Sequence, residues 1–141
     1  MTVNSATARY EGLGKEGRGR VAFASGALDA PYGFGTRFED EPGTNPEEMI
    51  AAAHGACFTM ATSFALAKAG HTEGSLETEC KVTLESSNGG FTVTQSALTL
   101  NARMPGIERA EFDRLANEAK AGCPISKLLN CEITLDARLE G

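Results

Sequence analysis

Hydrophobic and polar residues alternate along much of this chain with the period of two that is typical of half-buried β-strands. The alternating stretches predict strands at residues 6–10, 18–25, 27–32, 75–86, 91–104 and 131–139. Glycine-rich turns join neighbouring strands at residues 12–17 and 87–90, and the second turn, Ser-Asn-Gly-Gly, predicts a hairpin. Residues 33–43 have no regular pattern and are predicted as a loop.

The strongest helix signal begins at Asn45, which is a favourable N-cap residue. Pro46 suits the first helical position, and Glu47 and Glu48 bring negative charge to the positive end of the helix dipole. Glu48 stands at the third helical position, where the carboxylate of a capping box is expected. The helix is predicted to run to about Lys68 or Ala69, and Gly70 is expected to stop it.

Apolar residues occupy nearly the whole circumference of this helix, which is typical of a helix that is buried on most sides. They are Met49, Ile50, Ala51, Ala52, Ala53, Ala56, Phe58, Met60, Ala61, Phe64, Ala65 and Leu66. A single small protomer has too little other structure to cover such a helix, so we expect a homodimer that encloses it. The many alanines and hydroxyl side chains disfavour a membrane span.

Two further helices are predicted near the end of the chain. Residues 107–121 have helical spacing and end at Gly122, and a short helix follows at residues 124–129. Because hairpins and helices are segregated along the chain, the pattern indicates an α+β fold. The length of 141 residues predicts one domain over residues 1–141.

Composition and charge exclude several classes of partner. Hydrophobic residues make up 41% of the chain and charged residues 23%, which is ordinary for a soluble globular protein. The formal net charge of −6 argues against a nucleic-acid partner and against docking on anionic lipid. The first residues lack the pattern of a secretory signal, so we expect a cytoplasmic location.

Four cysteines, at positions 57, 80, 123 and 131, are the candidates for chemistry, and they form no CxxC pair and no zinc-ribbon spacing. We therefore expect no metal site, and Cys80 and Cys131 are interpreted as structural residues of predicted strands. Cys57 lies in the middle of the long helix, where it is either a reactive thiol or a small core residue. Cys123 precedes Pro124 at the entrance of the last helix, where free backbone N–H groups favour a thiolate.

Two segments resemble the motifs of a known family. The first comprises residues 36–39, Thr-Arg-Phe-Glu, and residues 43–61, which include Ala-Ala-Ala-His-Gly-Ala-Cys-Phe; the second is residues 123–129, Cys-Pro-Ile-Ser-Lys-Leu-Leu. Their order and spacing resemble the OsmC branch (osmotically inducible protein C-like) of the OsmC/Ohr thiol peroxidases, over essentially the whole chain. The resemblance implies antiparallel sheets wrapped around long buried central helices in an intertwined homodimer.

The resemblance also implies a reaction. Cys57 would be the peroxidatic thiolate, which attacks the O–O bond of an organic hydroperoxide, or of hydrogen peroxide, and becomes a sulfenic acid. Cys123 would be the resolving thiol, which forms a disulfide with Cys57. An external thiol of the dihydrolipoamide or thioredoxin type would then reduce this disulfide, and no cofactor is implied.

Arg37 and Glu47 match the arginine and the acid of the family. A guanidinium is always charged and planar, so it suits both a thiolate and a peroxide oxygen. Ten helical residues correspond to a rise of about 15 Å, so Glu47 is expected to orient Arg37 through paired hydrogen bonds rather than to touch Cys57. Arg18 and Arg20 on the second predicted strand are the reserve candidates for the arginine, and whether Glu47 acts within its own subunit or across the dimer stays open.

Several residues are candidates for binding the substrate. His54 lies three positions before Cys57 and is expected to line the site, although a satisfied core histidine is the alternative. The apolar part of a peroxide would contact Phe34, Phe38, Met49, Ile50 and Phe58, which are otherwise ordinary core residues. A non-enzymatic redox sensor or ligand-binding protein built on the same thiol pair, and a zinc protein, are the rival functions.

Overall fold

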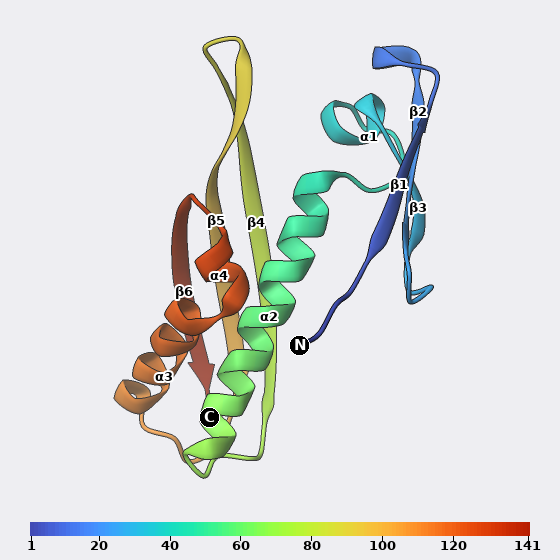
Figure 1. Ribbon diagram of the computed structural model, residues 1–141. Coiled ribbons are helices and arrows are strands. Elements are labelled where there is room, and N and C mark those ends of the chain that lie inside the picture. The colour runs from blue at the N-terminus through green and yellow to red at the C-terminus, as the bar shows by residue number, and fades with distance from the viewer. The chain divides into compact units, whose positions relative to one another are not determined.

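The computed structural model describes residues 1–141, which form two compact units, Met1–Met49 and Ile50–Gly141. The elements of each unit can be followed in Figure 1. The long helix α2 (Pro46–Lys68) begins in the first unit and continues in the second.

The first unit contains a small antiparallel sheet with the strand order β1-β2-β3. Its strands are β1 (Ala6–Glu11), β2 (Arg18–Phe23) and β3 (Asp29–Tyr32), so the three predicted strands are confirmed. The segment predicted as a loop contains a short helix, α1 (Phe34–Phe38), and that prediction is wrong. The Thr36 hydroxyl accepts a hydrogen bond from the Gly33 N–H at 2.8 Å, which stabilises the first turn of α1. A polar contact of this kind leaves no hydrophobic period in the sequence, so the helix was not predicted.

The start of α2 is capped as predicted, but without a full capping box. Asn45 Oδ1 accepts a hydrogen bond from the Glu48 N–H at 2.8 Å. The Glu48 carboxylate accepts a hydrogen bond from the Thr44 hydroxyl, also at 2.8 Å, and not from the N–H of Asn45. Glu48 therefore stabilises the residue before the cap instead of the cap itself.

The second unit is built on a sheet with the order β4-β5-β6. Strands β4 (Ser75–Ser87) and β5 (Gly90–Arg103) form the predicted antiparallel hairpin, whose turn has positive φ at Asn88 and Gly89. Strand β6 (Glu132–Glu140) pairs parallel to β5, so the expectation of purely antiparallel sheets is wrong. The physical reason is that helices connect these two strands, and such a crossover brings the chain back in the same direction.

Helices α2, α3 (Arg109–Gly122) and α4 (Pro124–Leu128) lie on one face of this sheet in Figure 1. The core forms where α2 and α3 pack on β5, and its fully buried members include Phe58, Leu98, Leu100, Phe112 and Ala116. Phe58 is therefore a core residue and does not line a binding site.

In the single chain, α2 is not buried on most sides, as expected for a helix that one small protomer cannot cover. Its buried residues are His54, Gly55, Phe58, Thr62 and Leu66, which follow one another at about four-residue intervals and form one narrow stripe. Large apolar side chains outside the stripe stay exposed, as Met60 is to 61% and Phe64 to 70%. By length and composition alone α2 could cross a membrane, but core helices of soluble proteins pass the same test.

Candidate active site

The sulfur atoms of Cys57 and Cys123 lie 2.7 Å apart, although 66 positions separate these residues in the chain. Both are free cysteines. Cys57 is half-buried in the middle of α2, and Cys123 is fully buried between the end of α3 and Pro124, the first residue of α4. The fold of the second unit therefore places two thiols in direct contact.

The two thiols differ in acidity. Burial raises the pKa of Cys57, and its hydrogen bond with Cys123 raises the pKa further, while the backbone N–H of Ile125 opposes this. Burial alone would also raise the pKa of Cys123, but hydrogen bonds from Cys57, from the N–H and hydroxyl of Ser126 and from the N–H of Ile125 outweigh burial and lower it. Within this unit, the thiolate form of Cys123 is the better stabilised.

A buried histidine lies beside the thiol pair. His54 has no exposed surface, and its Nδ1 lies 2.6 Å from the Ser96 hydroxyl while its Nε2 lies 2.8 Å from the Ser126 hydroxyl. Burial lowers the pKa of His54, so the neutral imidazole is favoured. We expected His54 to line the substrate site, with a satisfied core histidine as the alternative. In the structure both of its ring nitrogens are hydrogen-bonded to serines, which corresponds to the alternative.

Cys80 on β4 lies at the far end of the same polar cluster. Its sulfur is 3.2 Å from the Ser96 hydroxyl and 4.0 Å from His54 Nδ1. Burial raises the pKa of Cys80, in part offset by the hydrogen bond with Ser96. A thiol in this state is a poor nucleophile, which agrees with a structural reading of Cys80.

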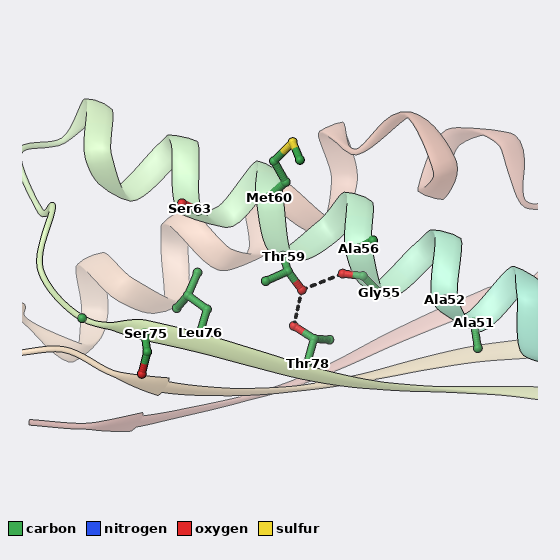
Figure 2. A pocket seen from close by; sticks show the side chains of 11 residues that line it. Ala51, Ala52, Gly55, Ala56, Thr59, Met60, Ser63, Ser75, Leu76 and Thr78 are labelled. Atoms are coloured by element: carbon green, nitrogen blue, oxygen red, sulfur yellow. Dashed lines mark hydrogen bonds between the residues drawn. The ribbon is translucent and has the colours of Figure 1, made fainter. Parts of the chain in front are cut away.

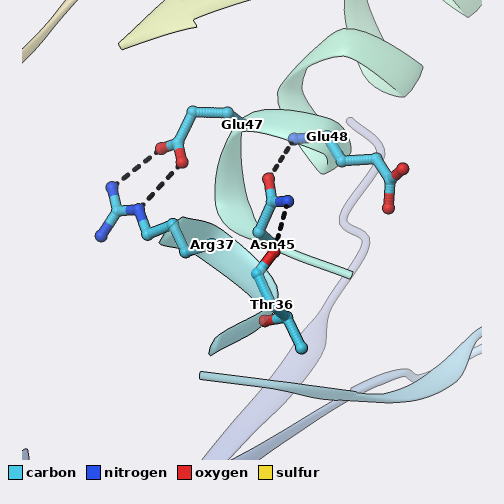
Figure 3. Close-up of polar contacts among 5 residues, drawn as sticks. All are labelled: Thr36, Arg37, Asn45, Glu47 and Glu48. Atoms are coloured by element: carbon cyan, nitrogen blue, oxygen red, sulfur yellow. Dashed lines mark hydrogen bonds and ion pairs between the residues drawn. The ribbon is translucent and has the colours of Figure 1, made fainter. Parts of the chain in front are cut away.

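In the first unit, Arg37 and Glu47 form a bidentate ion pair (Figure 3). Arg37 Nε donates to one carboxylate oxygen of Glu47 at 2.9 Å, and one of its terminal nitrogens donates to the other at 2.8 Å. This hydrogen bonding raises the pKa of Arg37, so the guanidinium keeps its charge. Glu47 is mostly buried and Arg37 is partly exposed, so the charge is held in a fixed orientation and remains accessible.

The local fold explains why Arg37 and Glu47 meet. Asn45 caps α2 with its side-chain oxygen, and its Nδ2 donates to the backbone carbonyl of Thr36 at 3.0 Å (Figure 3). One asparagine thus connects α1, which carries Arg37, to the first turn of α2, which carries Glu47. The reserve arginines lie elsewhere on β2, and Arg20 pairs there with Asp29 at 2.6 Å.

Arg37 also lines a cavity of about 290 Å³ in the first unit. Aromatic rings form much of its wall, and the lining residues include Tyr10, Tyr32, Phe34 and Phe38. The Lys15 ammonium lies 4.9 Å from the centre of the Phe34 ring, and the Arg37 guanidinium 5.4 Å from that of Phe38. The cavity thus combines apolar walls with fixed positive charge. The other two substrate candidates, Met49 and Ile50, are half-buried residues of α2 and are not among the residues that line this cavity.

The structure thus assembles the sequence candidates in two groups, Cys57 with Cys123 and His54 in the second unit, and Arg37 with Glu47 and Phe38 in the first. No group of three or more His, Cys, Asp or Glu residues is arranged to hold a metal ion. Sequence reasoning missed Ser126 and Ser96. Ser126 had a usable signal, because it lies three residues after Cys123 at a helix entrance, where side chains reach back to the cap.

A family model described as OsmC-like protein matches residues 38–138. The chain is 49% identical to Peroxiredoxin OsmC of Escherichia coli over 142 residues, which cover 99% of both chains. The chain belongs to the OsmC family. Its similarity to the organic hydroperoxide resistance protein OhrB of Bacillus subtilis is lower, at 32% identity over 86% of this chain and 88% of that protein.

Solved structures of OsmC-family proteins have the same fold. The crystal structure of OhrB of Bacillus subtilis matches with a TM-score of 0.71 at 26% identity, and the match covers 99% of this chain and 98% of that one. An OsmC-like protein from Vibrio cholerae matches with a TM-score of 0.78 at 16% identity, over 97% of this chain and 99% of that one. The fold of this chain is therefore similar to the folds of these two proteins.

Proposed function

We propose that this protein is a thiol peroxidase that reduces organic hydroperoxides, and hydrogen peroxide, by means of Cys57 and Cys123. The observation that carries the proposal is the 2.7 Å contact between the two sulfur atoms, since a peroxide-oxidised thiol needs a second thiol within reach. The full-length similarity to Peroxiredoxin OsmC and the similarity to organic hydroperoxide resistance proteins support the same reaction.

In the first step, the Cys57 thiolate attacks the terminal oxygen of the hydroperoxide. A sulfur–oxygen bond forms and the O–O bond breaks, so sulfur is oxidised by two electrons and the peroxide is reduced. The leaving alkoxide takes a proton and departs as the alcohol, or as water when the substrate is hydrogen peroxide. The product on the enzyme is the Cys57 sulfenic acid.

In the second step, the Cys123 thiolate attacks the sulfenic sulfur. A sulfur–sulfur bond forms, the sulfur–oxygen bond breaks, and hydroxide leaves as water after taking a proton. A dithiol of the dihydrolipoamide or thioredoxin type then supplies two electrons and two protons and restores both thiols. Such reductants are present in the cytoplasm, where we place the protein.

We assign to Arg37 the positive charge that makes Cys57 reactive. Burial and the contact with Cys123 both raise the pKa of Cys57, so a cation from outside its immediate surroundings is needed to favour its thiolate. Arg37 suits this role because Glu47 orients its guanidinium through two hydrogen bonds and leaves it partly exposed. Glu47 acts through Arg37 as a positioning residue.

The aromatic cavity beside Arg37 is our candidate for the apolar part of the substrate. Phe34 and Phe38 supply apolar surface there, and Arg37 supplies a hydrogen-bond donor for a peroxide oxygen. Met49 and Ile50 on α2 are proposed to extend this apolar surface, as the sequence suggested. A substrate with a hydrocarbon tail gains more from this cavity than hydrogen peroxide does.

We further propose that the protein is an intertwined homodimer in which the exposed side of α2 is covered by a second copy. A groove of about 560 Å³ runs between α2 and β4, and small residues such as Ala52, Gly55 and Ala56 line it (Figure 2). Thr59 and Thr78 also line the groove, and the Thr59 hydroxyl donates a 2.6 Å hydrogen bond to the Thr78 hydroxyl (Figure 2). Exposed Met60 and Phe64 make this side of α2 unfavourable in water.

The decisive experiment compares Cys57→Ser with Cys123→Ser in single-turnover and steady-state peroxide assays. Cys57→Ser should abolish the oxidation of the enzyme by one equivalent of cumene hydroperoxide. Cys123→Ser should keep this single turnover but lose regeneration by a dithiol. Full turnover by Cys57→Ser would overturn the proposed function, and slow stoichiometric oxidation of the unmodified protein would favour a redox sensor.

Mixed dimers assign the arginine to a subunit. In a dimer of one Cys57→Ser copy and one Arg37→Lys copy, the surviving Cys57 has a normal Arg37 only if the arginine acts across the interface. Activity of about half that of the unmodified dimer then identifies an arginine that acts in trans. Activity of about half that of the dimer with Arg37→Lys in both copies identifies an arginine that acts on the thiol of its own chain.

A further inference from the structure

A series of buried polar side chains, with half-buried Cys80 at its end, leads away from the thiol pair within the second unit. Cys123 is followed by Ser126, Ser126 lies 2.8 Å from His54 Nε2, and Ser96 lies 2.6 Å from His54 Nδ1. Cys80 ends the series at 3.2 Å from Ser96. Every link joins different elements except the first, which lies at the entrance of α4.

We propose that His54 and Ser126 are positioning residues for the second chemical step, in which they hold a hydroxyl proton toward the Cys123 thiolate that attacks oxidised Cys57. This inference rests on the proposed function. It assigns His54 a role that differs from substrate binding, and it adds Ser126 to the residues that serve the reaction.

The position of Ser126 makes the contact with Cys123 possible. Cys123 is the N-cap residue of α4 and Ser126 is its third helical residue, so both belong to the first turn of this helix. The hydroxyl and the N–H of Ser126 both stabilise the thiolate form of Cys123. Ser126 is buried, so water does not readily replace its hydroxyl.

The neutral state of His54 gives the series a direction. A neutral imidazole has one N–H donor and one acceptor nitrogen, so the two serines must bind it in opposite senses. When Ser126 donates its proton to the Cys123 thiolate, its oxygen can only accept, and it accepts from the His54 Nε2–H. His54 Nδ1 then accepts from the Ser96 hydroxyl, and Ser96 accepts from the Cys80 S–H. One tautomer of His54 thus orients every proton in the series toward Cys123.

The protonation state of Cys123 selects this orientation. A Cys123 thiol lets the series run either way, but a thiolate cannot donate and so requires the Ser126 proton. Stabilising the thiolate helps the resolving step, in which the sulfur–sulfur bond forms, the sulfur–oxygen bond of the Cys57 sulfenic acid breaks, and hydroxide leaves as water. The first step depends on the Cys57 thiolate and is not served by this series.

The test measures the two steps separately in Ser126→Ala, Ser126→Thr and the unmodified protein. Each is mixed with one equivalent of cumene hydroperoxide between pH 5 and 9. The loss of peroxide reports the first step, and mass spectrometry of acid-quenched samples reports the Cys57–Cys123 disulfide. Thr62→Val is the matched control, because it removes another fully buried hydroxyl of the second unit, which bonds only to the Phe58 carbonyl of its own helix.

We expect Ser126→Ala to shift the pH midpoint of disulfide formation upward by about one unit, because one hydrogen bond to a charged group is lost. At a pH well below both midpoints the thiolate fraction then falls about tenfold, but the more basic thiolate is about threefold more nucleophilic, so the rate falls about threefold. Ser126→Thr keeps a hydroxyl at this position, so its midpoint should equal that of the unmodified protein. The midpoint of Thr62→Val should also equal that of the unmodified protein. Peroxide loss should be unchanged in Thr62→Val.

A second variant addresses the histidine. His54→Asn keeps an amide near the position of Nδ1 but removes Nε2, which is hydrogen-bonded to the Ser126 hydroxyl. It should therefore shift the pH midpoint of disulfide formation upward, as Ser126→Ala does. An unchanged midpoint in Ser126→Ala would overturn the inference, and so would an equal shift in Thr62→Val. A protein in which no disulfide forms at all would instead contradict the proposed function, which keeps the two failures distinguishable.

Discussion

Arg37 and Glu47 face each other through two nearly parallel hydrogen bonds of 2.9 and 2.8 Å, which fix the plane of the guanidinium. Asn45 holds the two segments together by capping α2 and binding the carbonyl of Thr36. A cation fixed in this way costs little additional ordering when a thiolate or peroxide binds it. The orientation of Arg37, and not its charge alone, is therefore the property that substitutions should reveal.

Replacing Arg37 with lysine keeps the charge and removes the planar fork. We expect Arg37→Lys to lower kcat/KM for cumene hydroperoxide about tenfold or more, because an ammonium cannot make the paired contact with Glu47. Glu47→Gln should have a smaller effect in the same direction, since an amide can accept only one of the two hydrogen bonds. Stopped-flow measurement of the first oxidation step checks both variants.

The control for this prediction is Arg20→Lys, which alters an arginine that pairs with Asp29 on β2. Its kcat/KM should stay close to that of the unmodified protein. If Arg20→Lys or Arg18→Lys slows oxidation while Arg37→Lys does not, the catalytic arginine is on β2, and the assignment to Arg37 has to be abandoned.

A charge on the exposed side of α2 should prevent dimer formation. Phe64 is exposed to 70% in the single chain, and Phe64→Glu would bury a carboxylate if a second copy covered it. We expect Phe64→Glu to be monomeric at micromolar concentration and to unfold at lower urea concentration. Thr72→Glu, which adds the same charge beyond the end of α2, should stay dimeric. Light scattering after size-exclusion chromatography measures the mass, and a monomeric unmodified protein would refute the dimer.

Most elements of the fold could be predicted from the sequence because their signals are local. Period-two alternation located all six strands, and Asn45, Pro46 and Gly70 marked the ends of α2. The short helix α1 was missed, since its five residues are too few to develop a hydrophobic period. The parallel pairing of β6 was also missed, because strand direction depends on the crossover through α3 and α4 and not on any local pattern.

The candidate site was less accessible to sequence reasoning, because the distances within it are tertiary. Resemblance to the family motifs pointed to Cys57, Cys123, Arg37 and Glu47, but no pattern of composition or spacing places sulfurs 66 positions apart in contact. The surroundings of His54 could not be predicted at all, since Ser96 and Ser126 come from a strand and a helix far away in the chain.

Two glycines should respond in opposite ways to alanine. A Cβ at Gly55 in α2 would meet Cys80 Cβ at 3.5 Å, an ordinary contact, so Gly55→Ala should stabilise the helix by up to about 1 kcal/mol. Gly43 has a φ of +146°, and a Cβ there would lie 2.6 Å from the Pro31 carbonyl oxygen, so Gly43→Ala should destabilise the first unit. Urea denaturation measures both, and a destabilised Gly55→Ala would mean that something else occupies the space beside α2.

The pH dependence of stability should carry the signature of buried His54. Burial lowers its pKa below the ordinary value of 6.5, so as the pH falls through about 6.5 the unfolded chain takes up a proton that the folded chain does not. The free energy of unfolding therefore falls with falling pH, by up to about 1.4 kcal/mol per pH unit, until the pH reaches the lowered pKa. Above the ordinary value this contribution is fully present.

His54→Gln isolates this contribution, because glutamine can bond to the serines but cannot be protonated. We expect its free energy of unfolding to be lower than that of the unmodified protein at pH 8, and the difference to shrink as the pH approaches 5.5. The hydrogen-bonded pair of His71 and Glu111 is present in both proteins, so it cancels in the comparison. Urea titrations at half-unit pH intervals provide the data, and a difference that is constant with pH would mean that His54 is protonated equally in the folded and unfolded states.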